Sequence, residues 1–212
     1  MCATAQAMTD AALFMIAEIE ALGFHEIKVS LKAFDLTTTV EANRMFAACS
    51  DVPLHLGVTE AGPLLAGAVR SAATLALLLQ EGIGDTIRIS LTADPVEEVR
   101  AARFLLTALT LRPGGVVVSC PTCGRTSVDL LPIAERIETM LLTQNLDRVV
   151  AVMGCEVNGP GEARAADLGI AYGSKGVGVL FEAGRIVGRY TNSELEGELI
   201  RRLQKKEIRD GS

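Results

Sequence analysis

The sequence contains no tryptophan, two tyrosines and six phenylalanines, so aromatic residues make up only 4% of its 212 positions. Hydrophobic residues nevertheless reach 49% and charged residues 22%, a balance typical of a globular protein with an aliphatic core and not of a disordered chain. Basic residues are also in short supply, since 20 Lys plus Arg face 26 Asp plus Glu and give a formal net charge of -6. This charge argues against a nucleic-acid partner. It leaves room for an anionic ligand wherever Lys and Arg gather locally.

Long apolar runs are missing too. The first twenty residues lack the basic start and continuous apolar stretch of a secretory signal, because Asp10 interrupts them. The most apolar segment, residues 61–80, contains Arg70 together with Gly62, Pro63 and Gly67, so a buried helix is expected there and not a membrane span. We therefore expect a cytoplasmic protein with no membrane partner.

Three strand-like runs occupy the first half of the chain, and each has a helical pattern behind it. The strands are expected at 26–32, 53–60 and 86–91, and the helices at about 9–22, 37–49, 63–81 and 95–109. The first helix is expected to start from Thr9 or Asp10 as N-cap, and the last from Asp94 with Pro95 in its first turn. Such βα repetition with right-handed crossovers predicts a parallel sheet or part of a barrel.

The Pro- and Gly-containing run LRPGG at 111–115 interrupts this rhythm and predicts a boundary between domains at 1–111 and 112–212. Beyond it we expect a strand in GVVVSC, a helix at about 127–143 and a second strand in RVVAVMGC. The glycine-rich remainder is interpreted as loops with a hairpin in VGVLFEAGRIVGRY, and a charged helix at about 193–207 closes the chain.

Cysteine spacing is the strongest chemical signal. Cys120 and Cys123 form a CxxC pair at the end of one Val-rich strand, and Cys155 ends the next. If a right-handed crossover joins these strands, they are parallel and the three thiols meet at one sheet edge. Cys2 and Cys49 are expected to take no part, and a disulfide scaffold is not expected.

Three interpretations of this site stay open at the level of spacing. A thioredoxin-like redox pair explains the CxxC but leaves Cys155 without a role. Zinc needs a fourth Cys or His, and the only histidines, His25 and His55, lie far back in the chain. An iron-sulfur cluster uses all three thiols and leaves one iron for another ligand or for substrate, and Glu162 beyond the NGPG turn is a candidate for that ligand.

Several longer motifs carry a family resemblance. SCPTCGRT at 119–126 and GCEVNGPGEA at 154–163, with KVSLKA, HLGVTEAG and GIGDTIRISLTADPVEEV, resemble the 4-hydroxy-3-methylbut-2-enyl diphosphate synthases of isoprenoid biosynthesis over nearly the whole chain. The resemblance implies a 4Fe-4S cluster on Cys120, Cys123 and Cys155, with Glu162 as a fourth ligand that gives way to substrate. It also implies reductive opening of 2-C-methyl-D-erythritol 2,4-cyclodiphosphate with electrons from flavodoxin or ferredoxin.

The same resemblance implies a fold and a substrate site. The fold is α/β, with three βα units of an incomplete TIM-type barrel followed by a smaller iron-sulfur cluster domain. Substrate contacts are expected from charged residues near the strand ends and, with less support, from a histidine and two serines: Lys28, Lys32, Arg88 and Glu60, then His55, Ser30 and Ser90. Without the resemblance, such strand cations are more simply exposed edge residues. Lys175 and Arg125 are expected to be solvated charges.

A closed barrel needs eight βα units in about 250 residues, but only three precede the predicted boundary. We therefore expect this chain to be the C-terminal part of a longer synthase. The resemblance implies a homodimer for the complete enzyme. The alternatives are a non-catalytic cluster-binding subunit that needs a complementary N-terminal chain and, with the least support, a CxxC thiol-disulfide oxidoreductase.

Overall fold

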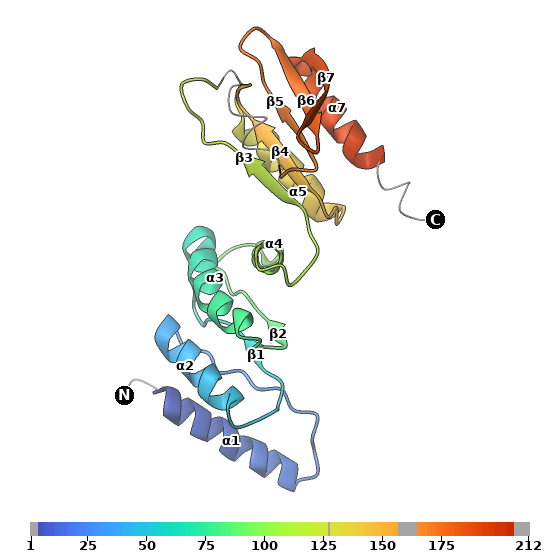
Figure 1. The fold of residues 1–212 in the computed structure, drawn as a ribbon. Coiled ribbons are helices and arrows are strands. Elements are labelled where there is room, and N and C mark those ends of the chain that lie inside the picture. Colours follow the sequence, from blue (N-terminus) through green and yellow to red (C-terminus); the bar gives the residue numbers. More distant parts are fainter. Residues whose placement is uncertain (1–3, 127, 157–164, 206–212) are drawn as a thin grey trace. The chain divides into compact units, whose positions relative to one another are not determined.

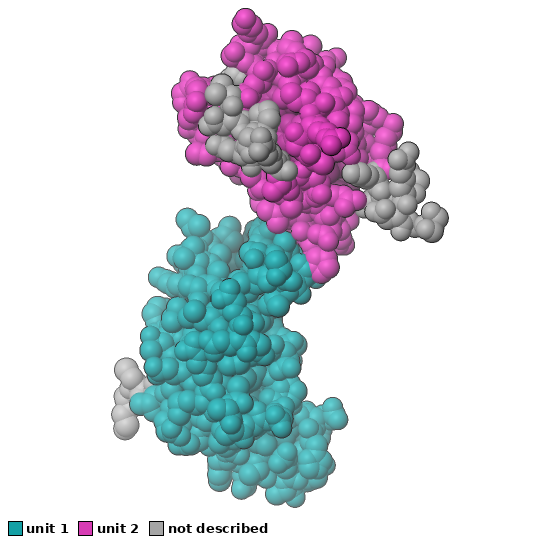
Figure 2. Space-filling model, in the orientation of Figure 1, with its two compact units in different colours: residues 1–112 teal, residues 113–212 magenta. Residues whose placement is uncertain are grey.

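The structure is a computed structural model that describes residues 4–126, 128–156 and 165–205. The chain divides into two compact units, with the division between Arg112 and Pro113 (Figures 1 and 2). Within the described ranges, no helix is both long enough and apolar enough to cross a membrane.

Unit 1 alternates helices with short parallel strands. Its elements are α1 (Ala5–Ala21), α2 (Leu36–Ala47), β1 (His55–Leu56), α3 (Leu64–Gln80), β2 (Thr86–Ile87) and α4 (Pro95–Ala108). β1 pairs in parallel with β2, and an isolated parallel bridge joins Val29 to Leu54. The segment expected as a strand at 26–32 therefore lies beside β1, but only Val29 pairs regularly. The three segments still form the predicted parallel order.

Side-chain caps mark the start of α1, α2 and α4. Asp35 accepts a hydrogen bond from the Thr38 N–H at 2.8 Å, and Asp94 accepts one from the Val96 N–H at 2.9 Å, with Pro95 following as predicted. The expected start of the first helix was wrong, because Thr4 is its N-cap. Thr9 is instead buried within α1, where its hydroxyl donates to Ala5 O at 3.0 Å and Ala42 O at 3.3 Å.

An aliphatic core lies between the strand segments and the helices of unit 1. Buried side chains alternate along the first strand segment, where Val29 and Leu31 point inward and Lys28 and Ser30 are exposed. The core members from the other elements include Leu54, Leu56, Leu75, Leu78, Ile89 and Phe46. Because of this alternation, the polar residues of the strand segments lie on the face opposite to the core.

Unit 2 contains a five-stranded mixed sheet. Its elements are β3 (Val116–Ser119), α5 (Leu131–Thr143), β4 (Val149–Met153), β5 (Leu168–Ala171), β6 (Val177–Glu182), β7 (Arg185–Thr191) and α7 (Asn192–Lys205). The strand order is β3-β4-β5-β6-β7, with the first two pairings parallel and the last two antiparallel. The predicted β6–β7 hairpin is confirmed. β5 was missed, because it lies in the stretch that was interpreted as loops.

Helices α5 and α7 pack on one face of this sheet (Figure 1). Ile137 of α5 and Leu199 of α7 share a buried cluster with Val150 and Val152 of β4. Ala151 and Met153 point to the opposite face, as strand alternation requires, and belong to a smaller cluster. Cys120 is half-buried and contacts both clusters, so it lies at the end of the sheet where the two faces meet.

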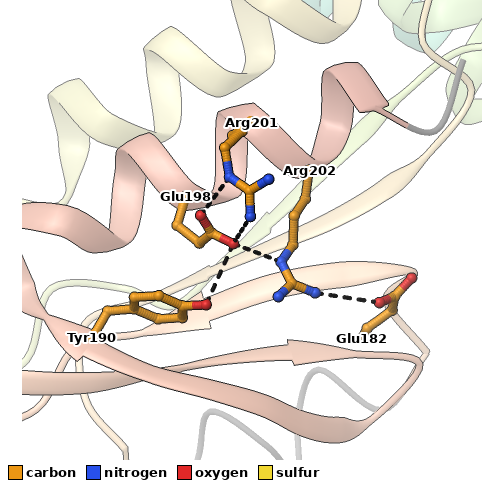
Figure 3. A network of polar contacts seen from close by, with 5 residues as sticks. All are labelled: Glu182, Tyr190, Glu198, Arg201 and Arg202. Carbon is orange, nitrogen blue, oxygen red and sulfur yellow. Dashed lines mark hydrogen bonds and ion pairs between the residues drawn. The ribbon is translucent and has the colours of Figure 1, made fainter.

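A polar network joins α7 to the hairpin (Figure 3). Glu198 accepts hydrogen bonds from Arg201 Nε at 2.7 Å, Arg202 Nε at 2.9 Å and the Tyr190 hydroxyl at 3.4 Å. Arg202 Nη1 also lies 3.7 Å from Glu182 Oε2 on β6. These contacts tie the last helix to both hairpin strands.

Candidate functional site

Two parallel strands bring the cysteine segments to one edge of the unit 2 sheet. Ser119, the last residue of β3, pairs with Val152 of β4, so Cys120 and the Gly154–Cys155 step leave the sheet side by side. Cys120 Sγ accepts a hydrogen bond from the Gly154 N–H at 3.3 Å. The sulfur of the CxxC strand therefore contacts the residue directly before Cys155.

The loop that carries Cys123 packs against the same glycine. Thr126 Oγ1 accepts from the Cys123 N–H at 3.3 Å, and the Thr126 N–H donates to Cys123 O at 3.0 Å, which closes a tight turn. A Cβ on Gly154 would lie 2.8 Å from both Thr126 Cγ2 and Thr126 Oγ1. Because Gly154 has no side chain, the Cys123 turn approaches the strand that ends at Cys155.

The local environment of Cys123 favours its thiolate. Backbone and side-chain hydrogen bonds from Arg125 lower the pKa of the Cys123 thiol, and the Thr126 hydroxyl adds a smaller contribution in the same direction. Arg125 is exposed, as expected of a solvated charge, and it also contacts Cys123. Its position two residues after the CxxC pair was the sequence signal for this contact.

The described side chains at this edge do not form a complete set of metal ligands. Within residues 4–126, 128–156 and 165–205, no group of three or more His, Cys, Asp or Glu side chains is placed to hold a metal ion. Cys120 and Cys155 are half-buried and Cys123 is exposed, and all three are free thiols. The candidate fourth ligand Glu162 lies outside the described residues, as does Cys2. Cys49 is exposed in unit 1, where its thiol donates to Met45 O at 3.3 Å.

The donors present nevertheless suit an iron-sulfur cluster. Cluster sulfurs and thiolate ligands are stabilised by backbone N–H donors and by nearby cations. The Gly154 N–H on Cys120 and the Arg125 contacts on Cys123 supply both kinds of partner. The edge therefore offers three thiols on two adjoining turns, and Cys120 directly contacts Gly154, the residue before Cys155.

A second candidate site lies on the polar face of the strand segments in unit 1. Burial and the neighbouring charges of Arg88 and Lys28 lower the pKa of the half-buried Lys32 ammonium. The pKa of His55 is also lowered, first by burial and then by the charges of Lys32, Lys28 and Arg88. The structure thus brings four of the predicted residues within electrostatic reach of one another. A lowered lysine pKa among neighbouring cations is typical of a site that an anion neutralises.

The histidine of this group has a partner on the neighbouring strand. His55 Nδ1 lies 2.7 Å from the Thr86 hydroxyl, its cross-strand neighbour. This contact fixes the imidazole ring on the sheet. Its lowered pKa keeps the ring neutral near pH 7, so His55 adds a hydrogen-bonding group and not a charge.

Arg88 and Ser90 lie in the segment directly after β2, on either side of the buried Ile89, and both are more exposed than Ile89. Arg88 is exposed, with its Nε 3.9 Å from Glu98 Oε2 on α4. The other oxygen of Glu98 accepts from the Leu91 N–H at 2.8 Å. Glu98, which the sequence reasoning did not identify, therefore holds the end of this segment and faces Arg88.

Glu60 projects from a loop whose backbone is fixed on both sides. The Thr59 N–H donates to Ala33 O at 3.2 Å, and Arg70 Nη1 donates to Ala61 O at 2.7 Å. Glu60 itself is exposed and has a φ of 53°, in the left-handed region that is uncommon for residues other than glycine. Residues whose backbone is held in such a conformation by its surroundings are often found at functional sites.

Two family models match the chain. Residues 1–103 match the family model of the GcpE TIM-barrel domain, and residues 116–205 match that of the GcpE protein C-terminal domain.

Curated relatives cover almost all of the chain. The 4-hydroxy-3-methylbut-2-en-1-yl diphosphate synthase (flavodoxin) of Geobacter sulfurreducens is 49% identical over 203 residues, which are 95% of this chain and 57% of that protein. The proteins of the same name from Desulfotalea psychrophila and Bacillus cytotoxicus are 47% and 49% identical, and the chain covers 56% and 54% of them. The chain therefore spans about half the length of the curated relatives that it matches.

Proposed function

Because the chain belongs to the GcpE family, we propose that it carries the reductive centre of a 4-hydroxy-3-methylbut-2-enyl diphosphate synthase. The substrate is 2-C-methyl-D-erythritol 2,4-cyclodiphosphate. Opening its ring and removing one hydroxyl group as water consumes two electrons and two protons for each molecule of product.

The observation that carries this proposal is the 3.3 Å hydrogen bond from the Gly154 N–H to Cys120 Sγ. It places the end of the CxxC strand against the strand that ends at Cys155. In the proposal, Cys120, Cys123 and Cys155 hold a 4Fe-4S cluster, and Glu162 is the ligand that substrate replaces. When bound, such a cluster supplies single electrons and an iron that acts as a Lewis acid toward a substrate oxygen.

The residues of unit 1 are proposed to bind the diphosphate. Lys32, Lys28 and Arg88 would neutralise its charge, because burial and then the like charges of Arg88 and Lys28 lower the pKa of Lys32, and an anion would offset both effects. His55, Ser30 and Ser90 would donate hydrogen bonds. Glu60, exposed on its fixed loop, is proposed to exchange a proton with the substrate oxygen that leaves as water.

The proposal also includes partners and assembly. Flavodoxin is the proposed electron donor, because it is the donor that the relatives' names specify, and ferredoxin is the alternative. A homodimer of the complete enzyme in the cytoplasm follows from the family resemblance.

An anaerobic turnover assay tests this function. Chain reconstituted with iron and sulfide is incubated with the cyclodiphosphate and either reduced flavodoxin or reduced ferredoxin, and the linear diphosphate is quantified by mass spectrometry. Lys32→Met and Glu162→Gln are each expected to abolish product formation, whereas Cys49→Ser, which changes a thiol outside both sites, leaves the rate unchanged. Equal rates for Lys32→Met and the parent chain would contradict the proposed substrate site.

A second candidate function is a cluster-binding chain that works only together with a barrel-forming partner. The observation in its favour is that the described part of unit 1 contains three parallel strand segments, whereas a closed barrel of this type has eight. Product that forms only after a polypeptide with the remaining strands is added would support this function over the first.

A further inference from the structure

Gly57 is a buried glycine directly after β1, at the point where Lys32 and Arg88 approach each other. A Cβ built on Gly57 would lie 2.8 Å from the Arg88 carbonyl oxygen, 3.0 Å from Lys32 Cε and 3.1 Å from Lys32 Nζ. Real Cβ atoms essentially never come within 3.0 Å of such atoms. An alanine here would therefore displace the backbone of one site residue and the side chain of the other.

The two neighbours reach Gly57 from different strands. On one side, the Arg88 N–H donates to Leu56 O at 2.9 Å and holds the segment after β2 against β1. On the other side, the terminal methylene and ammonium of Lys32 lie across the glycine. The end of the Lys32 side chain therefore packs against the backbone of Gly57, which has no side chain.

The backbone of Lys32 is fixed independently by α2. Asn43 Nδ2 donates to Leu31 O at 2.8 Å, and the Thr39 hydroxyl accepts from the Ala33 N–H at 3.1 Å. Both α2 side chains are fully buried. The backbone on either side of Lys32 is therefore fixed. The position of the Lys32 ammonium then depends on how closely its side chain can approach Gly57.

We propose that Gly57 is a positioning residue that sets the distance between the Lys32 ammonium and Arg88, so that both cations can contact one diphosphate group. This inference rests on the proposed function for its ligand, but its geometric part does not. A bulkier residue at position 57 would lift Lys32 away from Arg88 and leave two separate cations in place of a pair.

The first measurement uses the unchanged chain. Lysine side chains are labelled by reductive methylation with carbon-13, and the Lys32 signal is assigned from its loss in Lys32→Arg. We expect a nuclear Overhauser effect between the Lys32 ε-protons and the Gly57 α-protons. We also expect the pKa of Lys32 to lie below the ordinary lysine value, because the side chain is half-buried and because Arg88 and Lys28 carry like charges nearby. Absence of the contact would overturn the proposal whether or not any variant folds.

The second measurement compares Gly57→Ala with Gly67→Ala. Gly67 lies on α3, and its added Cβ would also meet a backbone oxygen, Gly62 O, at 2.8 Å, but no lysine. Gly57→Ala is expected to raise the titration midpoint of Lys32 toward the ordinary lysine value, and Gly67→Ala to leave it unchanged. An unchanged Lys32 titration in folded Gly57→Ala, or an equal change in both variants, would contradict the positioning role.

Binding of inorganic pyrophosphate, measured by calorimetry, separates this inference from the proposed function. Gly57→Ala should bind pyrophosphate about tenfold or more weakly than the unchanged chain, as small displacements of positioned groups do. If the unchanged chain binds no pyrophosphate, that result counts against the proposed function. The Lys32 contact and the Lys32 titration then still test the role of Gly57. Full pyrophosphate affinity in Gly57→Ala would overturn the role.

Discussion

At the scale of single residues, Glu60 combines an exposed carboxylate with a strained backbone. Its φ of 53° costs a residue with a Cβ about 1–2 kcal/mol relative to the right-handed conformations, whereas glycine accepts it freely. We predict that Glu60→Gly raises the free energy of unfolding, measured by urea denaturation, by about 0.5–1 kcal/mol. The same substitution should abolish turnover, because it removes the carboxylate.

The matched control is Glu60→Ala, which also removes the carboxylate but keeps the strain. It should lose turnover without any gain in stability. A Glu60→Gly chain that is no more stable than Glu60→Ala would show that the loop does not impose this conformation.

Part of the candidate site could be predicted residue by residue, because period-two alternation separates polar from buried positions. Lys28 and Ser30 are exposed on either side of the buried Val29, as expected, although the segment barely forms a strand. What could not be predicted are the supporting contacts. Gly57 contacts residues that are distant in sequence, and Arg125 acts through a local turn. No periodic pattern marks such contacts. The functional roles of the site residues stay predictions.

At the scale of elements, α2 holds the segment that carries Lys32 through a buried amide. Asn43 Nδ2 donates to Leu31 O and to Thr39 O, each at 2.8 Å. We predict that Asn43→Leu, which keeps the volume but removes the donor, lowers the free energy of unfolding by about 1–3 kcal/mol, because a buried carbonyl loses its partner. Glu41→Ala, on the exposed face of the same helix, should change it by less than about 0.5 kcal/mol in the same denaturation experiment. Equal effects would contradict this role of α2.

The contact between α7 and the hairpin predicts a pH dependence. Hydrogen bonds from Arg201 and then Arg202 lower the pKa of Glu198 from 4.5 to about 2 in the folded chain. The ionised carboxylate therefore stabilises unit 2 above about pH 4.5, and this contribution is lost as the pH falls from 4.5 toward 2. Urea denaturation should show a smaller loss of stability over this range in Glu198→Gln than in the unchanged chain. Glu135→Gln, which changes an exposed glutamate of α5, should show the same loss as the unchanged chain.

Most elements could be predicted because their hydrophobic periods and caps agree. The helices at 36–47, 64–80 and 95–108 lie within a few residues of the predicted ranges. β5 escaped prediction because its residues, LGIA, are short and fully buried, so they show no alternation. The first helix was placed too late because Thr9 looks like a cap in sequence but finds its partners inside the fold.

At the scale of the whole molecule, the chain is two units that each carry one half of the proposed chemistry. Unit 1 gathers cations on a parallel set of strand segments, and unit 2 gathers thiols at the edge of a mixed sheet. The sequence motifs predicted this separation of residue types, since Lys28 and Lys32 precede residue 112 and the CxxC pair follows it. The mixed character of the second sheet could not be predicted, because it depends on β5.

The central claim is that Cys120, Cys123 and Cys155 bind one cluster together, and metal content after anaerobic reconstitution tests it most directly. Iron and acid-labile sulfide should each reach about four per chain in the unchanged chain and in Cys49→Ser, with the brown colour of a cluster. Cys155→Ser should lose most of both. Full iron and sulfide in Cys155→Ser, or a colourless unchanged chain, would contradict the claim.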